Sequence, residues 1–522
     1  MSNAAAARNE RMPAGIPYIV SNEFAERFCY YGINAILAVY MVRFLHFGEA
    51  QATAWQSLFK SGVYLFPMLG AVISDVLWGK FRTIIVFSIA YSTGCAVLAL
   101  FDGQTGLAVG LCLIALGTGG IKPCVSTNVG DQFTAKNQHL IERAFSWFYL
   151  SINAGALGSI LLCPWLLETS GPRWAFGVPA IAMAVATLVF WMGRRQFAVV
   201  PPAGKQWLRE VFSAGGARLV GRLGVIYLFI AIFFSLFEQS IGVTWTLQAR
   251  SSLMDKTLGF GITLLPAQIQ FFNPLFILML VPLLSYGVYP QVAKCVAVTP
   301  LRKIGVGFFV AASSFVVIAW IESRIQNGIV TSVWWQILAY AILTAGEVLV
   351  SVTALEYSYK QAPLRIKSFI MALYLLSLSA GNLITAVVAV NMVKPVQGVE
   401  VIAGEQTVVV LPAELRFVPG QKIDFGGDTG ITVDVGEGKT VSLAGTFIVG
   451  DSRDGTAPLL DVVHRKPVTA SGQFNAEAQV STYKLVGPQF FMFFCYLALA
   501  AGVTWIFVSR LLKEQTYVRQ DD

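Results

Sequence analysis

The stretch Ile16–Phe47, IPYIVSNEFAERFCYYGINAILAVYMVRFLHF, is apolar enough to cross a membrane, yet it carries polar side chains through its middle. These residues recur every three or four positions, so on a helix they share one face. They are Glu23, Glu26, Arg27, Tyr30, Tyr31 and Asn34, and the opposite face holds Phe24, Phe28, Ile33 and Leu37. An ionised side chain at the bilayer centre costs roughly 2.5 to 3.5 kcal/mol, so three charges on one spanning helix must face protein or water. Such a stripe is typical of a pathway for a solute or a proton.

The composition indicates a protein that crosses the membrane many times. Of the 522 residues, 56% are hydrophobic and 13% are charged, and the mean hydropathy is +0.65, which excludes an ordinary soluble enzyme and a disordered chain. The net charge of +8 lies in short loops, where cations set membrane orientation, so the lipid bilayer and not nucleic acid is the expected partner. The seven cysteines and three histidines lack the spacing of a metal site, and no cofactor is expected.

Twelve segments reach the roughly 20 apolar residues that a bilayer requires. They are residues 16–46, 52–77, 83–101, 106–126, 142–168, 174–196, 221–249, 264–289, 302–322, 332–359, 367–393 and 487–511. We therefore expect a six-helix bundle in 1–197, a linker in 198–220, helices seven to eleven in 221–393, and helix twelve with a tail in 487–522. Lys and Arg concentrate in the connections after even-numbered segments, which predicts that both termini and the linker are cytoplasmic.

Residues 394–486 break this pattern, because they are rich in Val, Gly, Asp and Thr and read as short strands and turns, for example at 407–411 and 430–444. The same orientation rule places this insertion outside, in the periplasm or beyond the cell, and without cysteine it needs a small antiparallel core. Gly438-Lys439-Thr440 mimics the end of a phosphate-binding loop, but Val433 stands at the required first glycine, so nucleotide binding is not predicted. The predicted fold is an all-α polytopic membrane protein with two six-helix bundles and a β-rich insertion.

Two polar residues stand out in the fourth and fifth segments. Lys122 follows Gly117-Thr118-Gly119-Gly120, a run that permits close helix approach, and precedes Pro123. As a buried cation it needs an anion, either in a static ion pair with Glu23 or Glu26, or in alternation between a protein carboxylate and a substrate carboxylate. Asn153, on the fifth segment, offers both a donor and an acceptor to a backbone-like group.

The second half contributes three polar side chains from three helices. Asn273 precedes Pro274, so it either repairs the backbone beside the proline or binds solute. Glu238 and Glu347 lie far in sequence from local cations. Buried carboxylates of this kind are expected to accept protons, which a proton-coupled machine requires.

These strings together resemble one family. Asn22-Glu23-Phe24-Ala25-Glu26-Arg27-Phe28-Cys29-Tyr30-Tyr31-Gly32 is similar to the ExxERFxYYG signature of the proton-dependent oligopeptide transporters, within the major facilitator superfamily. Further matches are 117–123 with Gly130-Asp131-Gln132-Phe133, Phe148-Tyr149 to Asn153-Ala154-Gly155, Phe237-Glu238-Gln239 with Trp245-Thr246-Leu247-Gln248, and Glu347 through Leu355-Glu356-Tyr357-Ser358-Tyr359. They cover both halves and leave out only the insertion.

The resemblance implies a bacterial symporter in the inner membrane that imports di- and tripeptides with protons by alternating access and works as a monomer. It implies that Arg27 and Lys122 receive the peptide carboxylate, while Glu347, with Asn153 and Asn273, holds the amino terminus and backbone. The positions that match side-chain pockets in the family are Tyr30, Tyr31, Tyr64, Phe234 and Tyr374. The carboxylates that match proton-handling positions are Glu23, Glu26 and Glu238.

The sequence departs from the family pattern at several positions. Asn34 stands where many members have arginine, so the usual partner of Glu238 is missing, and Tyr374 replaces a tryptophan of some bacterial relatives. The second segment has no histidine, so proton coupling must rest on carboxylates. Three alternatives to peptide transport remain: transport of nitrate or another small anion, against which Glu347 argues; an intramembrane enzyme, for which no nucleophile motif is found; and a receptor whose insertion binds the ligand.

Overall fold

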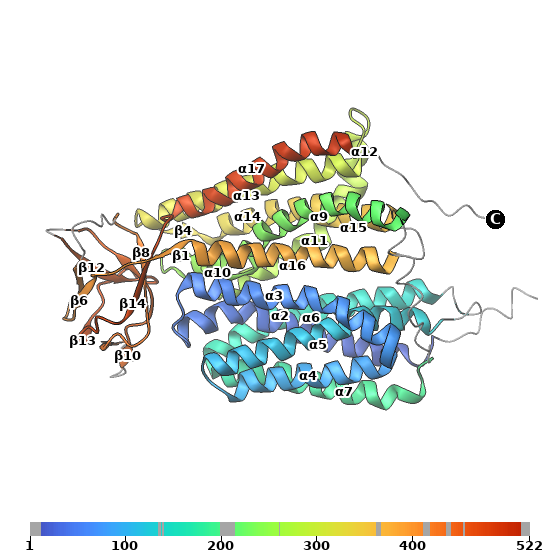
Figure 1. Cartoon of the computed structure of the whole chain (residues 1–522), viewed down its shortest axis with the longest axis horizontal. Coiled ribbons are helices and arrows are strands. Elements are labelled where there is room, and N and C mark those ends of the chain that lie inside the picture. Colours follow the sequence, from blue (N-terminus) through green and yellow to red (C-terminus); the bar gives the residue numbers. More distant parts are fainter. Residues whose placement is uncertain are drawn as a thin grey trace, which may run out of the picture.

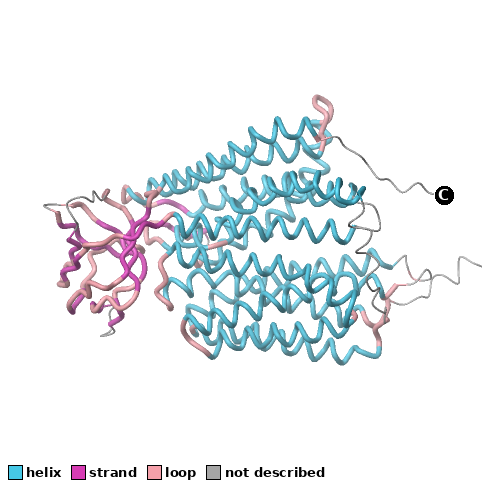
Figure 2. The backbone as a smooth tube through the Cα atoms, viewed as in Figure 1, coloured by secondary structure: helices cyan, strands magenta, loops and turns pink. Residues whose placement is uncertain are grey.

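The computed structural model describes residues 12–133, 137, 140–198, 214–259, 261–361, 367–410, 418–434, 440–452 and 455–512. Figure 1 shows long helices that lie side by side in two groups, with a cluster of strands at one end. Figure 2 shows the same division by secondary structure: the helices form one body and the strands gather beyond it. The end of the helices that carries the strands is called the outer end below.

The first group contains the helices before residue 200. They are α2 (Ile16–Arg43), α3 (Glu49–Val72), α4 (Lys80–Leu100), α5 (Gln104–Asp131), α6 (Ile141–Ser170) and α7 (Pro172–Met192). The helix α2 packs against α6 and α7, while α3 and α4 both pack against α5. Close packing depends on glycine, since a Cβ at Gly119 would overlap Phe66 of α3 and one at Gly120 would overlap Phe87 of α4. The predicted role of the glycine run before Lys122 is therefore confirmed.

The second group contains the remaining helices. They are α9 (Ala214–Ile241), α10 (Val243–Arg250), α11 (Phe272–Pro282), α12 (Tyr289–Val292), α13 (Pro300–Gln326), α14 (Val333–Glu347), α15 (Thr353–Gln361), α16 (Lys367–Asn391) and α17 (Pro488–Leu511). Several segments that were predicted as continuous helices are interrupted, including residues 332–359, which pass through a π turn at Val348–Val352. Residues 221–249 break at Gly242, and residues 264–289 begin with a 3-10 turn at Pro266–Phe271 and pass through a π turn at Leu283–Val288.

Each group has a core of its own. Ile33, Leu37 and Phe176 belong to the first core, and Phe233, Phe308 and Trp505 to the second, all nearly or fully buried. Within the described residues, ten helical segments are long and apolar enough to cross a membrane. The polar helix α2 and helix α3 lie alongside them in Figure 1, and with these two the segments number twelve. The predicted fold class, two six-helix bundles with a β-rich insertion, is confirmed.

The insertion follows α16 and precedes α17. Its strands are β5 (Val393–Pro395), β6 (Glu400–Ile402), β7 (Val408–Val410), β8 (Lys422–Gly426), β9 (Ile431–Asp434), β10 (Thr440–Ser442), β11 (Gly445–Val449), β12 (Thr456–Asp461), β13 (Ala470–Gly472) and β14 (Gln479–Tyr483). Seven form an antiparallel sheet in the order β5-β14-β8-β11-β12-β7-β6, and β10-β9-β13 form a second sheet. Buried Val409, Ile423 and Leu459 of the first sheet share one hydrophobic core with Ile431 and Val433 of the second. Strands were predicted at 407–411 and 430–444, and the described parts of these ranges contain β7 and, in the second, β9 and β10. Gly438 and Lys439 of the phosphate-loop mimic lie outside the described residues.

Short strands also pair at the outer ends of the second bundle. They are β1 (Met254–Asp255) with β4 (Thr331–Ser332), and β2 (Thr257–Gly259) with β3 (Ile262–Thr263). The β1–β4 pair joins the connection after α10 to the start of α14. β1 and β4 lie at the outer end of the second bundle, beside the insertion (Figure 1).

Candidate functional site

The polar stripe of α2 is buried and its charges pair with one another. Nε of Arg27 lies 2.7 Å from Oε1 of Glu23, one helical turn earlier, and 3.0 Å from Oε2 of Glu26. Glu23 and Glu26 are almost fully buried, whereas Arg27 keeps some exposure. Neither carboxylate oxygen of Glu26 has a hydrogen-bond partner. One guanidinium therefore serves two buried carboxylates, which leaves Glu26 the less satisfied of the two.

Lys122 of α5 lies against aromatic rings. Its Nζ is 4.5 Å from the centre of the Tyr64 ring of α3 and 4.9 Å from that of Tyr30 of α2, within the range of a cation–π interaction. Within the described ranges, no carboxylate forms an ion pair with Lys122. The static ion pair with Glu23 or Glu26 that the sequence left open is thus not formed. Because Lys122 is only half-buried, it remains open to an anion that enters from solvent.

Glu347 ends α14, where the chain enters a π turn at Val348–Val352. Its Oε2 accepts a hydrogen bond of 2.9 Å from Nδ2 of Asn273, which also donates to Thr344 at 3.1 Å. The amide of Asn273 thus binds two side chains of α14, and both of these hydrogen bonds are to side chains and not to the backbone beside Pro274. Glu347 is half-buried and keeps one oxygen for another donor.

Tyrosines lie near charged or polar groups of both bundles. The Tyr31 hydroxyl is close enough to interact electrostatically with Arg27 of its own helix and with Glu347 of the other bundle. Tyr374 of α16 interacts in the same way with Glu347 and with Tyr64 of the first bundle. We define the central site as the residues that these contacts join, namely Arg27, Tyr30, Tyr31, Tyr64, Lys122, Asn273, Glu347 and Tyr374.

Two predicted residues are not joined to the central site by any contact of this kind. The amide of Asn153 donates to the Tyr149 carbonyl of its own helix at 2.8 Å, so it is occupied locally. Phe234 of α9 is half-buried and packs edge-on against Phe233 and Phe237. Both lie on helices of the expected bundles, but their predicted contact with substrate stays a prediction.

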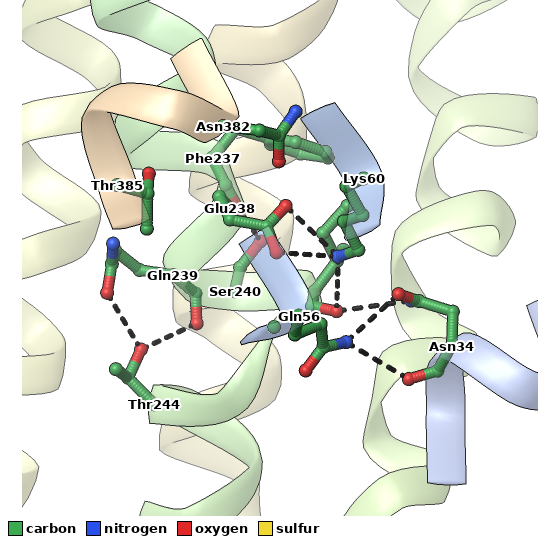
Figure 3. Close-up of polar contacts among 12 residues, drawn as sticks. Asn34, Gln56, Lys60, Phe237, Glu238, Gln239, Ser240, Thr244, Asn382 and Thr385 are labelled. Atoms are coloured by element: carbon green, nitrogen blue, oxygen red, sulfur yellow. Dashed lines mark hydrogen bonds and ion pairs between the residues drawn. The ribbon is translucent and has the colours of Figure 1, made fainter. Parts of the chain in front are cut away.

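A second polar cluster lies toward the outer end, where α3 meets α9. Nζ of Lys60 lies 2.8 Å and 3.0 Å from the two carboxylate oxygens of Glu238, and both side chains are at most 4% exposed. Figure 3 shows the ammonium group pointing at both oxygens at once. Glu238 was expected to have no cation nearby, and that expectation is wrong, because Lys60 reaches it from the other bundle.

Asn34 belongs to the same cluster. The chain breaks at Gly242 between α9 and α10, and the Ile241 carbonyl accepts hydrogen bonds from Asn34 at 3.2 Å and from Lys60 at 3.1 Å. Gln56 in turn donates to the Asn34 side chain at 3.0 Å, as Figure 3 shows. We call Asn34, Gln56, Lys60, Glu238 and the Ile241 carbonyl the outer cluster. It ties α2 and α3 of the first bundle to α9 of the second.

Comparison with known proteins agrees with this geometry. The sequence profile PTR2, described as the POT family, matches residues 81–215 and 214–407. The chain belongs to the POT family. Family membership confirms the resemblance that the motifs of both halves indicate.

Curated relatives of this POT family member carry transporter names. It is 38% identical over 365 residues to "Solute carrier family 15 member 2" of Homo sapiens, which covers 60% of this chain and 50% of the relative. It is 37% identical over 362 residues to "Peptide transporter family 1" of Drosophila melanogaster. This match covers 60% of this chain and 48% of the relative. The chain thus spans about half the length of the curated relatives it matches.

Solved structures cover more of this POT family member. The crystal structure of the POT family transporter PepTSo is 33% identical, with a TM-score of 0.68, and the match covers 73% of this chain and 90% of that one. A POT peptide transporter solved in complex with alafosfalin is 26% identical, with a TM-score of 0.63, over 74% of this chain and 91% of that one.

Lys60 is the residue of this POT family member that the sequence reasoning missed. It lies in the middle of the apolar segment 52–77. Burying its charge in the membrane costs as much free energy as burying that of Lys122 in segment 106–126. The signal was therefore present: an intramembrane lysine needs a partner. The partner could not be read from the sequence, because Glu238 is 178 residues away and on the other bundle.

Proposed function

We propose that this chain is a proton-coupled symporter that imports di- and tripeptides by alternating access. The observation that carries the proposal is the separation of charge in the central site. A cation without an ion-pair partner in the described part of the chain, Lys122, comes from the first bundle, and a half-buried carboxylate, Glu347, comes from the second. A dipeptide in water is a zwitterion, and its two ends match these two walls.

The peptide carboxylate binds Lys122 and Arg27, because charge-assisted hydrogen bonds to carboxylate are roughly twice as strong as neutral ones. The amino terminus binds Glu347, with Asn273 holding that carboxylate in place. Recognition of the two ends leaves the side chains to Tyr30, Tyr31, Tyr64, Phe234 and Tyr374, and Asn153 to the backbone. A small anion such as nitrate would gain nothing from Glu347, which argues for a zwitterion as substrate.

Proton coupling rests on competition for Arg27. The guanidinium is shared by Glu23 and Glu26, and Glu26 has no hydrogen bond of its own. A proton on Glu26 removes one negative charge, so Arg27 can turn toward the peptide carboxylate. When the peptide leaves, Arg27 returns to Glu26 and the proton is released. Glu238 takes part at the outer cluster, where a proton on its carboxylate frees Lys60 and lets the outer ends separate.

We further propose the sidedness and organisation that the sequence predicts. Both termini and the linker 198–220 face the cytoplasm of a bacterial inner membrane, and the insertion 394–486 faces outside. Residues 1–197 form one moving bundle, and 221–393 with 487–522 form the other. One copy suffices for transport, since the described central site draws its charges from a single chain, and the proton is the coupling ion.

The experiment is uptake of radiolabelled dialanine into proteoliposomes, with and without an inward acid gradient. The proposal expects accumulation above the external concentration only with the gradient. Accumulation of labelled nitrate instead would support the anion alternative, and the absence of any gradient-driven uptake would contradict symport. Deletion of residues 394–486 separates a receptor from a transporter, because only a receptor would lose its activity completely.

A further inference from the structure

The insertion is attached firmly to the second bundle. β5 begins two residues after α16 ends and pairs with β14, which leads into α17. Two hydrogen bonds add to these covalent links: Ser252, after α10, donates its N–H to the Val463 carbonyl at 2.9 Å, and Arg465 donates to the Gln326 carbonyl at the end of α13 at 3.1 Å. The insertion therefore moves with the second bundle.

The insertion also binds the first bundle, at the outer end of α3. The first N–H groups of a helix have no partner within the helix. Here side chains of the insertion supply the partners: Thr446 of β11 accepts from the Glu49 N–H at 2.9 Å, and the Tyr483 hydroxyl of β14 accepts from the Ala50 N–H at 2.9 Å. Residue 48, the N-cap of α3, is glycine and offers no side-chain cap of its own.

Charge and shape are matched at the same contact. Nζ of Lys422 lies 2.5 Å from Oε2 of Glu49. The carboxylate of Asp424 lies against Gly48, where a Cβ would overlap Oδ2, and Oδ2 accepts a hydrogen bond from Tyr483 at 3.0 Å. A carboxylate beside the N-terminus of α3 also faces the positive end of the helix dipole. We call Gly48, Glu49 and Ala50, with Lys422, Asp424, Thr446 and Tyr483, the latch contact.

We propose that the insertion is an outer latch that binds the first bundle only while the outer ends are closed, and that it stabilises this state. The inference rests on the alternating access proposed above. For the outer ends to separate, α3 must move away from the insertion, because the insertion is fixed to α16 and α17. Each cycle therefore breaks the Lys422–Glu49 ion pair and exposes two N–H groups of α3, and solvent replaces these partners.

The latch adds to the outer cluster and does not duplicate it. Lys60 and Glu238 close the interface within the membrane, and they come from helices of opposite bundles. The latch contact closes the same interface at the outer end of α3, where water is available. Loss of the latch should therefore shift the balance between the two states without removing either state.

The test measures the distance between spin labels at the outer ends of the two bundles, in the full chain in lipid nanodiscs. Thr169 at the end of α6 and Asn391 at the end of α16 are exposed and suit the labels, after the exposed Cys112 and Cys295 are replaced by serine. Lys422→Glu should raise the population with separated outer ends about fivefold or more, since a lost contact is worth roughly 1 kcal/mol. Glu49→Lys combined with Lys422→Glu should restore the wild-type distribution.

Two further variants keep the test independent of folding. Gly48→Ala adds one methyl group where Asp424 lies and should open the latch while the insertion keeps its own core. Lys466→Ala removes an exposed cation of the insertion and should leave the distribution unchanged. If the spin-label distance distributions of wild type, Lys422→Glu and Gly48→Ala are the same, the latch proposal is wrong. Dialanine uptake is measured in parallel: absence of uptake by wild type contradicts the symporter, whereas unchanged distances with normal uptake contradict the latch alone.

Discussion

Two lysines of the first bundle, Lys60 and Lys122, lie in similar apolar segments and have opposite surroundings. Lys60 is 1% exposed and is bound by both oxygens of Glu238 from the other bundle. Lys122 is half-buried, lies against two tyrosine rings, and has no ion-pair partner among the described residues. A cation that is fully satisfied by protein holds the two bundles together. A cation that protein leaves open is available for a ligand.

The two surroundings explain how one membrane protein can carry two intramembrane cations with different tasks. Burial of an ion pair is costly, and we infer that this pair is kept because it fixes one arrangement of the two bundles against another. The pair in the outer cluster fixes the closed arrangement of the outer ends. Aromatic rings at Lys122 lower the cost of an unpaired cation without neutralising it, so the site stays ready for a carboxylate.

The largest expected effect comes from removal of the open cation. Lys122→Ala should abolish dialanine uptake, by roughly 100-fold or more, because a charge-assisted contact to the peptide carboxylate is lost together with the positive potential of that wall. Glu347→Ala should have a similar effect at the other end of the peptide. Lys303→Ala is the matched control, since Lys303 also lies over a tyrosine ring, at 4.0 Å from that of Tyr289, away from the central site. A wild-type rate of dialanine uptake by Lys122→Ala would contradict the claim that Lys122, unlike Lys60, is open to a ligand.

Removal of Lys60, the paired cation, should mainly change the balance between closed and separated outer ends. Lys60→Ala leaves Glu238 buried without its partner, which costs about 3 kcal/mol at the low end for a broken buried pair. The closed arrangement of the outer ends should lose roughly 100-fold in population, as measured by the spin-label distance between Thr169 and Asn391. Gln56→Ala, which removes only neutral hydrogen bonds in the same cluster, should cost about 1 kcal/mol.

A cation moved from position 60 to position 34 provides a stricter test of the same prediction. The Asn34 side chain already reaches the Ile241 carbonyl that Lys60 binds. Asn34→Arg in the Lys60→Ala background should therefore restore an ion pair with Glu238. The population with closed outer ends should be at least tenfold larger in this double variant than in Lys60→Ala alone. Equal distances in the single and the double variant would show that position 34 cannot replace position 60.

The sequence predicted the helices and the central site better than the contacts between bundles. Helical periodicity placed Glu23, Glu26 and Arg27 on one face because these residues lie within one turn or two of each other. Charge in an apolar segment marked Lys122 and Glu347 as candidates for the same local reason, and their function stays a prediction. The resemblance to the POT family extended this to Tyr64 and Tyr374.

Contacts across the bundles had no such local signal. Lys60 of α3 reaches Glu238 of α9 only by its side chain, while the backbone of α3 packs on α16. Asn34 suggested an absent partner where a different helix supplied one. The insertion was predicted as strands from Val, Thr and Gly content, but its contact with Gly48 and Glu49 joins residues nearly 400 positions apart. Only the tertiary structure reveals that those strands cap a helix of the other bundle.

A moderate effect is expected where a carboxylate shares a cation. Glu26→Gln keeps the shape of the side chain but cannot release a proton, while Arg27 keeps its 2.7 Å contact with Glu23. Exchange of labelled for unlabelled dialanine across the membrane should continue, whereas accumulation driven by an acid gradient should fall to the equilibrium ratio. Glu168→Gln is the control, because that carboxylate pairs with Arg43 at the outer surface. Full accumulation by Glu26→Gln, and by Glu23→Gln, would contradict the coupling.

The smallest effect concerns the pH dependence of the latch contact. Burial raises the pKa of Asp424 to about 6, and the nearby Glu49 carboxylate adds to this. Lys422 on the same strand and the hydroxyls of Thr446 and Tyr483 act in the opposite direction. In the separated state water returns the pKa toward its ordinary value near 4, so the docked state binds the proton more tightly. The stabilisation of the latch is therefore fully present below about pH 4 and is lost as the pH rises through about 6.

Acid at the outer end should consequently favour closed outer ends by a few-fold between pH 7.5 and 5.5. The spin-label distance distribution measures this shift, and Asp424→Asn should make it independent of pH. Burial lowers the pKa of His46, a second titratable group, which lies in the connection between α2 and α3. His46→Gln separates the two groups: a pH response that survives in Asp424→Asn but disappears in His46→Gln would assign the dependence to the histidine and leave the latch without a proton of its own.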